Sequence, residues 1–251
     1  MQPSPVMSTL GRRLRLGVVG GGPGSFIGGV HQRAALLDDC YEIVTGVVSS
    51  DPDRARRAGH EMGFPPERTY GTAREMFDAE STREDCIDVV AIMTPNDTHY
   101  EYATAALEHG LDVICDKPMT NTLEEAESLH AKVAEADRVF CLTHNYSGYP
   151  MIRQAKAMVD DGQLGTIRLV QVEYVQGGRA HENDPDPDGD VPWRFDPSRG
   201  GSSLVLNDVG THAHHLVRFV TGLEVAQVSA EVGTIVPVSY THLTLPTTPY
   251  V

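Results

Sequence analysis

The first part of the chain alternates between short apolar runs and longer amphipathic stretches. Each apolar run has the length of a strand, and the stretches between them have the periodicity of helices. We predict strands at 14–19, 41–48, 87–92, 111–115 and 139–142, and helices at 25–38, 51–62, 97–109 and 122–135. Strands that alternate with helices in this way are typical of a parallel, doubly wound sheet. We count the run at 87–92 as the fourth strand and expect it to be buried on both faces.

The pattern changes after Asn145. We predict a helix at 150–161, an alternating strand at 167–176, a helix near 207–221 and a last strand from Ala226 to about residue 238. Helices beside so few strands indicate a partial α+β domain with an open-faced, unfinished sheet. The fold class is therefore α/β, with a doubly wound domain at 12–143 and an incomplete second domain at 144–237.

The two ends of the chain lack such patterns. Residues 1–11 are expected to form a loose lead-in. Residues 238–251 show no convincing period and resemble a transposon-based sequencing adapter translated in frame. We expect this segment to be a non-native tail on a chain cut near residue 237; a genuine flexible tail is the alternative.

Composition narrows the class of partner. The formal net charge of −15 disfavours nucleic acid and anionic membranes, because both need a basic surface. No apolar stretch approaches the roughly 18 residues that span a bilayer. The four cysteines are widely spaced without a CxxC pair, which favours reduced thiols in a cytoplasmic protein.

A glycine cluster, Gly20 to Gly24 with Pro23, lies between the first predicted strand and the first predicted helix. In this context glycines let the backbone approach a pyrophosphate, which rests on the N–H groups of the helix. Gly20 and Gly22 fit the first two positions of the dinucleotide fingerprint, and the third position falls on Ser25. We therefore predict a Rossmann-type domain in which Gly20, Gly22, Gly24 and Ser25 bind NAD or NADP.

The end of the second predicted strand usually carries an acidic residue that holds the adenosine ribose. Ser49 occupies this place. A serine does not repel a 2′-phosphate, and Arg54 or Arg56 lies within reach of one. The sequence thus slightly favours NADP over NAD.

Three further segments carry polar groups suited to catalysis. Thr94-Pro95-Asn96 with His99 follows the strand at 87–92, and Cys115-Asp116-Lys117-Pro118 follows the strand at 111–115. Both segments are expected at the carboxyl edge of the sheet, where ligands bind. Asp208 and His212 are four residues apart, which places them on one face of a regular helix.

Together, the glycine turn, the segments around Thr94 and Lys117, and Gly200-Gly201 before Asp208 and His212 resemble the Gfo/Idh/MocA oxidoreductases. This family includes glucose–fructose oxidoreductase and inositol dehydrogenase, and the resemblance covers about residues 12–237. The family usually has glutamate where this chain has Asp116, which leaves the role of Asp116 open. Its second domain normally continues well beyond the part that this chain matches.

The resemblance implies a hydride transfer between NAD(P) and the hydroxyl-bearing carbon of a sugar or polyol. It implies that His212 is the base, that Asp208 orients it or holds the substrate hydroxyl, and that Lys117 polarises the oxygen. Further residues are expected at the cofactor: Thr94, Pro95, Asn96, His99, Asp116, Lys117 and Arg194. Asn145, Tyr146 and His215 are expected at the substrate, and the full-length protein is expected to be a homo-oligomer.

Plainer alternatives exist for each signal. Lys117-Pro118 alone is a common turn, Asp208 suits a helix N-cap, and Asn145-Tyr146 suits a hinge. A metal at Asp208, His212 and His215 lacks a fourth ligand, so we predict no metal site. The acidic loop at 181–190 is expected to be solvated. A non-catalytic NAD(P)-binding regulator on the same fold is the alternative function, although it would not need Lys117, Asp208 and His212.

Overall fold

The computed structural model describes residues 4–176 and 192–231, and the chain divides into two compact units, residues 1–143 and 144–251. The predicted acidic loop at 181–190 and the predicted tail at 238–251 lie outside the described residues. Within the described ranges no helix is both long and apolar enough to cross a membrane.

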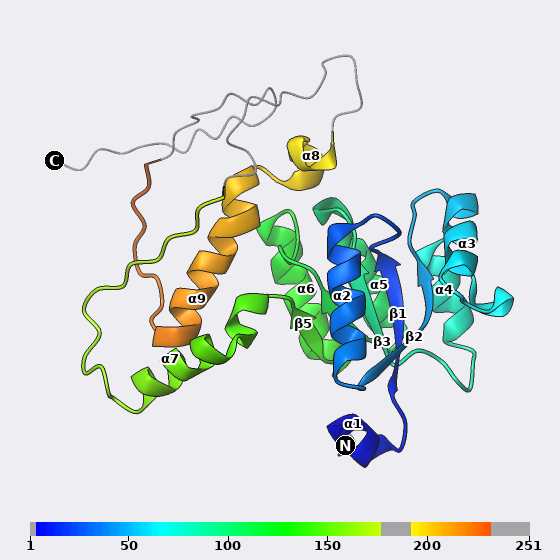
Figure 1. Cartoon of the computed structure of the whole chain (residues 1–251). Coiled ribbons are helices and arrows are strands. Elements are labelled where there is room, and N and C mark those ends of the chain that lie inside the picture. Colours follow the sequence, from blue (N-terminus) through cyan, green and yellow to red (C-terminus); the bar gives the residue numbers. More distant parts are fainter. Residues whose placement is uncertain (1–3, 177–191, 232–251) are drawn as a thin grey trace. The chain divides into compact units, whose positions relative to one another are not determined.

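Unit 1 contains a parallel sheet of five strands in the order β2-β1-β3-β4-β5 (Figure 1). The strands are β1 (Leu14–Gly20), β2 (Tyr41–Val47), β3 (Val89–Met93), β4 (Asp112–Cys115) and β5 (Phe140–Leu142). Every neighbouring pair is parallel, so all strands end at the same edge of the sheet. The predicted doubly wound sheet is confirmed.

Helices connect the strands of unit 1. They are α2 (Phe26–Leu37), α3 (Pro52–Glu61), α4 (Ala73–Glu80), α5 (His99–Glu108) and α6 (Leu123–Ala136). Short polar side chains accept a backbone N–H at the starts of four of them: Ser25, Asp51, Thr72 and Thr122. Each such cap stabilises its helix by about 1 kcal/mol, which explains why these helices begin where they do.

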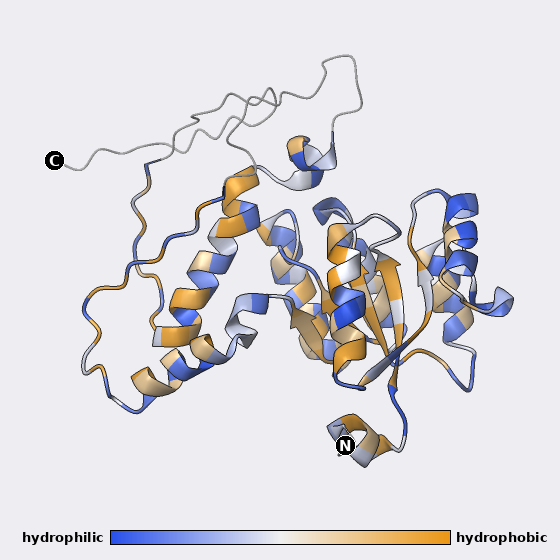
Figure 2. Ribbon diagram, in the orientation of Figure 1, coloured by the Kyte–Doolittle hydropathy of each residue, from blue (hydrophilic) through white to orange (hydrophobic). Residues whose placement is uncertain are grey.

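Two hydrophobic cores cover the two faces of this sheet. Val19, Val90 and Ile92 belong to the core that also contains residues of α4, α5 and α6. Val18, Val89 and Ala91 belong to the other core, with residues of α2 and α3. Adjacent strand residues point to opposite faces, so a strand with both faces buried is apolar at successive positions. Figure 2 shows these strands as largely hydrophobic.

The place of the run at 87–92 in the strand count differs from the prediction. Val89–Met93 is the third strand along the chain, not the fourth, because between β2 and β3 the chain makes one isolated parallel bridge, Gly46 with Thr69. A 3₁₀ turn at Pro66–Arg68 precedes this bridge, and Thr72 begins α4 just after it. The segment between these two features is too short for a strand.

A buried ion pair fixes this bridging segment. Arg68 donates to both carboxylate oxygens of Glu80, at 2.9 and 2.6 Å, and the Glu80 side chain is 1% exposed. Tyr70 Oη and the Ile87 backbone N–H also donate to this carboxylate, at 3.0 and 3.2 Å. Four hydrogen bonds to one carboxylate therefore hold the segment beside β2 without a strand ladder.

The N-terminal prediction is also corrected, because residues 5–10 form helix α1 (Pro5–Leu10) instead of a loose lead-in. Ser4 Oγ accepts the Met7 N–H and donates to the Asp39 carbonyl, which caps the helix and attaches it to the sheet domain. Gly11, with φ of +68°, ends it. Proline at the first helical position completes this local start signal.

Unit 2 is helical throughout its described secondary structure. It contains α7 (Pro150–Asp160), the short α8 (Pro197–Gly200) and α9 (Thr211–Thr221), with a π turn at Leu206–Gly210 before α9. Helices α7 and α9 pack against each other, and Lys156 Nζ lies 5.9 Å from the centre of the Phe219 ring.

The two strands predicted in the second domain are wrong for the described residues. Neither 167–176 nor 226–231, the described part of the last predicted strand, is a strand. Strands need a neighbour for their N–H and C=O groups, and these segments have no ladder partner within 144–176 and 192–231. Their side chains are correspondingly open, with Leu169 and Val175 each 87% exposed.

Candidate functional site

The strand order sets the position of the candidate site in unit 1. The chain runs from β1 outward to β2 and then returns to β3 on the other side of β1, which makes β1 and β3 the switch point of the sheet. Gly20 of β1 aligns with Met93 of β3, and Ile92 of β3 aligns with Cys115 of β4. Doubly wound sheets bind ligands outside the carboxyl ends of their strands at this point. Unit 1 therefore brings the glycine turn and the segments after β3 and β4 to one edge.

The glycine turn after β1 has the geometry of a phosphate cradle. Gly20 and Gly24 adopt φ of +79° and +83°, a region that glycine enters without strain. A Cβ at Gly22 would lie 2.4 Å from the Val48 carbonyl oxygen, so no side chain fits there. Ser25 Oγ accepts the Gly28 N–H at 3.2 Å and begins α2. The turn and the first N–H groups of α2 fit a dinucleotide pyrophosphate.

Gly28 performs the close-packing role that the fingerprint gives to its third glycine. A Cβ at Gly28 would lie 2.0 Å from the Gly21 carbonyl oxygen and 2.5 Å from its carbon. The sequence pattern placed the third position on Ser25 and did not identify Gly28. The available signal was a glycine one helical turn after a capping serine, which is where α2 must approach the turn.

The end of β2 holds a fixed guanidinium. Arg54 Nε donates to Ser49 Oγ at 2.8 Å, and Ser49 Oγ also accepts the Asp51 N–H at 3.1 Å. Both side chains are at the surface beside the start of α3. Arg56 instead forms an ion pair with Glu75 at 2.9 Å. Hydrogen bonds from the Gly71 backbone and from Arg56 lower the pKa of Glu75, which favours the charged form in this pair. Of the two arginines that the sequence suggested for a 2′-phosphate, Arg54 is the one that contacts Ser49, and we keep Arg54 as the candidate.

The segment after β3 folds into a compact turn. Thr98 Oγ1 donates to Thr94 Oγ1 at 2.7 Å, and Asn96 begins a 3₁₀ turn, Asn96–Thr98, and is 9% exposed. His99, the first residue of α5, is 1% exposed. Its ring nitrogens face the carbonyl oxygens of Pro118 and Thr94, at 2.7 and 3.0 Å.

The segment after β4 presents Lys117 beside an anchored carboxylate. Asp116 Oδ1 accepts the Thr143 hydroxyl at 2.7 Å and the Lys117 backbone N–H at 3.0 Å. The Thr143 N–H donates to the Cys115 carbonyl at 3.0 Å, which joins the ends of β4 and β5. The peptide bond between Lys117 and Pro118 is cis. Asp116 thus has a structural function in unit 1, holding the backbone from which Lys117 extends.

His31 on α2 lies in the same electrostatic neighbourhood. Burial lowers the pKa of His31, and the negative charge of Asp116 acts in the opposite direction. The sequence pattern singled out neither His31 nor Thr143. Thr143 had no motif to mark it, because its role depends on β5 lying next to β4.

Unit 2 gathers aromatic and polar residues around His212. His212, in the first turn of α9, is 6% exposed, and its ring centre lies 4.7 Å from that of Tyr146. Tyr146 and Asn145 lie in a 3₁₀ turn, Asn145–Gly148. The Tyr146 hydroxyl contacts the Tyr174 hydroxyl at 2.5 Å. This hydrogen bond, together with burial and the nearby acidic groups of Tyr174, Tyr149 and Asp208, raises the pKa of Tyr146 to about 12.

Two further predicted residues have defined surroundings in unit 2. His215, one turn after His212, stacks on His144 with ring centres 4.2 Å apart, and burial lowers its pKa. The Arg194 guanidinium lies 4.5 Å from the centre of the Trp193 ring. A Cβ at Gly200 would lie 2.7 Å from the Arg194 carbonyl, which explains a glycine at this position.

The segment that carries Asp208 and His212 is not the regular helix that was predicted. Asp208 lies in the π turn, Leu206–Gly210, and His212 lies in α9. Hydrogen bonds in a π turn span five residues, so the four-residue spacing of a regular helix does not apply here unchanged. Such turns are frequent at functional sites. Tyr174, which the sequence pattern did not mark, lies close to the same group of residues through Tyr146.

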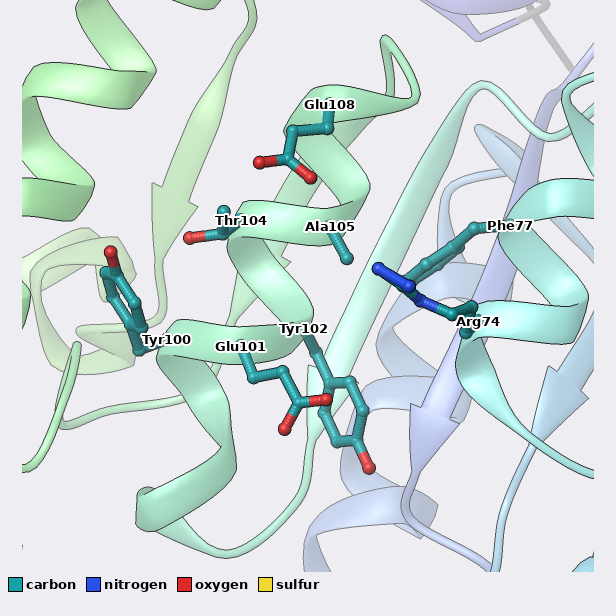
Figure 3. Close-up of a pocket in the computed structure, with 8 residues that line it drawn as sticks. All are labelled: Arg74, Phe77, Tyr100, Glu101, Tyr102, Thr104, Ala105 and Glu108. Carbon is teal, nitrogen blue, oxygen red and sulfur yellow. The ribbon is translucent and has the colours of Figure 1, made fainter.

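Two other features bear on the choice of this candidate site. Over the described residues, no three histidine, cysteine or acidic side chains form a group that could hold a metal ion. A cavity of about 260 Å³ lies between α4 and α5, lined by side chains that include Arg74, Phe77, Glu101 and Glu108 (Figure 3). None of the predicted site residues lines this cavity.

The chain is similar to known oxidoreductases over both units. Residues 14–144 match the family model of the oxidoreductase family with an NAD-binding Rossmann fold, and residues 152–246 match the GFO/IDH/MocA C-terminal domain. An uncharacterised oxidoreductase of Bacillus subtilis, YfiI, is 35% identical over 84% of this chain and 54% of its own length. Levoglucosan dehydrogenase of Pseudarthrobacter phenanthrenivorans is 30% identical over 90% of this chain and 55% of its own length.

A solved structure gives the same result. An inositol dehydrogenase homologue from Azotobacter vinelandii, in complex with NAD+, superimposes with a TM-score of 0.80 at 39% identity. The match covers 88% of this chain and 55% of that one. The chain therefore spans about half the length of the relatives that it matches.

Proposed function

The chain belongs to the Gfo/Idh/MocA oxidoreductase family, and from this we propose that it is an NAD(P)-dependent dehydrogenase acting on a sugar or polyol. In this proposal residues 12–143 bind the dinucleotide and residues 144–237 bind the substrate. When the cofactor is bound, its nicotinamide ring accepts or donates the hydride. The observation that carries the proposal is a single sheet edge bearing both a glycine turn that excludes side chains and a lysine directly after β4.

The polar residues receive the following roles. Lys117 stabilises negative charge that develops on the substrate oxygen, because an ammonium group held in place needs no rearrangement during the reaction. His212 takes the hydroxyl proton, since an imidazole titrates near neutral pH. Asp208 holds His212 or the substrate hydroxyl. Asn145, Tyr146 and His215 offer the amide, hydroxyl and imidazole groups that suit a polyhydroxylated substrate.

The remaining predicted residues are assigned to the cofactor. In unit 1 they lie at the carboxyl ends of β1, β3 and β4: Gly20, Gly22, Gly24, Ser25, Thr94, Pro95, Asn96 and Asp116. Arg194 of unit 2 is added to this set on the resemblance. His99 was also expected at the cofactor; since its side chain is 1% exposed, we assign it a supporting role at this edge.

A substrate screen tests the proposed reaction. The protein is supplied with sugars and polyols, and formation of reduced cofactor is followed by its absorbance. We expect turnover of at least one polyol or sugar. Lys117→Ala and His212→Ala should each lower kcat at least about a hundredfold while cofactor affinity changes little. Near-normal turnover in both variants would refute the catalytic roles of Lys117 and His212. Tight cofactor binding without any turnover would favour a non-catalytic regulator.

We also propose that NADP is preferred over NAD. The support is the absence of an acidic residue at Ser49 and the guanidinium of Arg54 held against it at 2.8 Å. Arg54→Ala should lower kcat/KM for NADP about tenfold or more and change that for NAD much less, because a charge-assisted hydrogen bond contributes about 1.5–3 kcal/mol. Arg57→Ala, on the exposed side of α3, is the matched control. A wild-type protein that strongly prefers NAD would contradict the assignment.

The remaining aspects of the proposal concern its setting. We propose a reducing, cytoplasmic location, supported by four free cysteines, of which Cys115 is buried. We propose a small-molecule partner with no role for nucleic acid or membrane, and a homo-oligomeric full-length protein. Light scattering on the purified protein measures the oligomeric state, and a strictly monomeric full-length protein would contradict that part.

A further inference from the structure

His99 is a polar side chain buried in unit 1. It begins α5, is 1% exposed, and lies on the same helix as Ala103 and Ala106, which are completely buried. A buried imidazole needs hydrogen-bond partners, and those partners define its function.

The partners of His99 belong to two different loops. Its Nδ1 lies 2.7 Å from the carbonyl oxygen of Pro118, in the segment after β4. Its Nε2 lies 3.0 Å from the carbonyl oxygen of Thr94, in the segment after β3. The ring therefore stands between the segment that carries Thr94, Pro95 and Asn96 and the segment that carries Asp116 and Lys117.

Both ring nitrogens of His99 face carbonyl oxygens, which only accept hydrogen bonds. The contact from Nδ1 to Pro118 is the shorter of the two, at 2.7 Å. We therefore assign the ring proton to Nδ1, as the donor to Pro118, and make this assignment one of the points to be tested.

The contacts continue from His99 in both directions. A Cβ at Gly20 would lie 2.6 Å from the Met93 carbonyl oxygen and 2.9 Å from Thr94 Cγ2, so the glycine turn rests on the end of β3. Pro118 directly follows Lys117, whose backbone N–H is bonded to Asp116. His99 thus connects the end of β3, on which the glycine turn rests, to the segment that carries Lys117.

We propose that His99 is a positioning residue for Lys117: its Nδ1–H holds the Pro118 carbonyl, and its ring spaces this carbonyl from that of Thr94. The proposal rests on the proposed function for its catalytic consequence. Its structural content, the bond from Nδ1 to Pro118, stands independently of which reaction occurs. Positioning matters because a displacement of about 1 Å at a reacting group can cost about a hundredfold in rate.

Two substitutions separate the two ring nitrogens. The amide nitrogen of asparagine is one bond from Cγ, as Nδ1 is, whereas that of glutamine is one bond further along, near the place of Nε2. His99→Asn therefore keeps the donor to Pro118, and His99→Gln loses it. His109, which follows the last residue of α5, provides a control, because its Nδ1 and Nε2 contact Ala105 and Asp78, at the other end of the helix from His99.

The kinetic test compares kcat with cofactor affinity. His99→Gln should lower kcat about 10- to 100-fold, while the dissociation constant for reduced cofactor changes less than about threefold. His99→Asn should recover most of the loss, and His109→Gln should match the wild type. Equal effects of Asn and Gln at position 99, or a wild-type kcat in His99→Gln, would overturn the proposal.

Two measurements do not need turnover, and the first of them needs no variant. In the wild type, two-bond ¹H–¹⁵N correlation of the histidine rings should show a protonated Nδ1 on His99; a ring protonated at Nε2 alone would overturn the assignment. Amide hydrogen exchange should be faster at residues 117–122 in His99→Gln than in His99→Asn. A protein without any dehydrogenase activity that passes both measurements would refute the proposed function but leave the His99 bond intact.

Discussion

Gly28→Ala is the sharpest test of how the phosphate turn is built. The added Cβ would lie 2.0 Å from the Gly21 carbonyl oxygen, while ordinary contact begins at 3.4 Å. The turn and α2 must therefore separate by about 1.4 Å, the difference between these two distances. The opposing atoms are backbone, so no side chain can rotate away to relieve the clash.

The expected cost follows from this displacement. Overpacking of this kind destabilises by about 1–3 kcal/mol, or roughly 2–12 °C in the melting temperature of a domain near 150 residues. Moving the turn also weakens its backbone hydrogen bonds to a phosphate, each of which contributes about 1.5–3 kcal/mol. We therefore expect cofactor affinity to fall at least about tenfold, which corresponds to about 1.4 kcal/mol.

Gly29→Ala is the matched control for this substitution. The residue is next to Gly28 in α2, and the nearest atom to its Cβ would be Arg33 Nη1 at 3.6 Å. Alanine there should raise stability by about 0.5–1 kcal/mol, because glycine weakens a helix interior. Titration calorimetry with reduced cofactor and thermal unfolding measure both variants. If Gly28→Ala binds cofactor as tightly as Gly29→Ala does, the close-packing role of Gly28 is refuted.

Three stability predictions concern ionisable side chains of unit 1. Glu80→Leu should destabilise by about 3–5 kcal/mol in urea unfolding, because it leaves buried Arg68 with only the longer, exposed ion pair to Asp85. A loss below about 1 kcal/mol would show that the Arg68–Glu80 pair is dispensable. Burial and the charge of Glu80 raise the pKa of Tyr70 to about 12. The folded state favours the neutral phenol, so the stabilisation from Tyr70 is complete below about pH 10 and is lost between about pH 10 and 12. Tyr70→Phe should therefore lose less stability over this pH range than the wild type does. An unchanged dependence of stability on pH would contradict this prediction. Asp88 has a lowered pKa because hydrogen bonds from Arg12 and the Arg15 N–H outweigh the effect of burial. The stabilisation from ionised Asp88 is present above about pH 4 and is lost as the pH falls. Asp88→Asn should therefore be less stable than the wild type at pH 7, and its stability should fall less steeply in acid. An equal fall in the stability of both proteins would exclude this role of Asp88.

Local patterns were sufficient for most of unit 1. Buried strands such as Val89–Met93 are apolar because both of their faces pack against a hydrophobic core. The starts of several helices could be predicted from their capping residues, Ser25, Asp51 and Thr122. The family resemblance was confirmed by the matches over both units. The errors occurred where a short segment depends on partners elsewhere. The bridge at Thr69 replaces a strand because a buried ion pair holds the chain there.

The predicted strand at 167–176 failed for the opposite reason. Its alternation of apolar and polar residues is a strand pattern, but a strand exists only when another segment pairs with it. Among the described residues of unit 2 no segment does so. Alternation is a property of the sequence, whereas pairing is a property of the fold.

The sequence by itself determined the dinucleotide domain, the identity of the glycine turn and the polar residues that follow β3 and β4. These features depend on neighbours in the chain: a strand, a turn and a cap are set by a few consecutive residues. Only the tertiary structure showed that Gly28 abuts Gly21, that Thr143 anchors Asp116 and that His99 bonds Pro118. These contacts join residues from different strands and loops, and their partners are fixed by how the sheet brings its strand ends together.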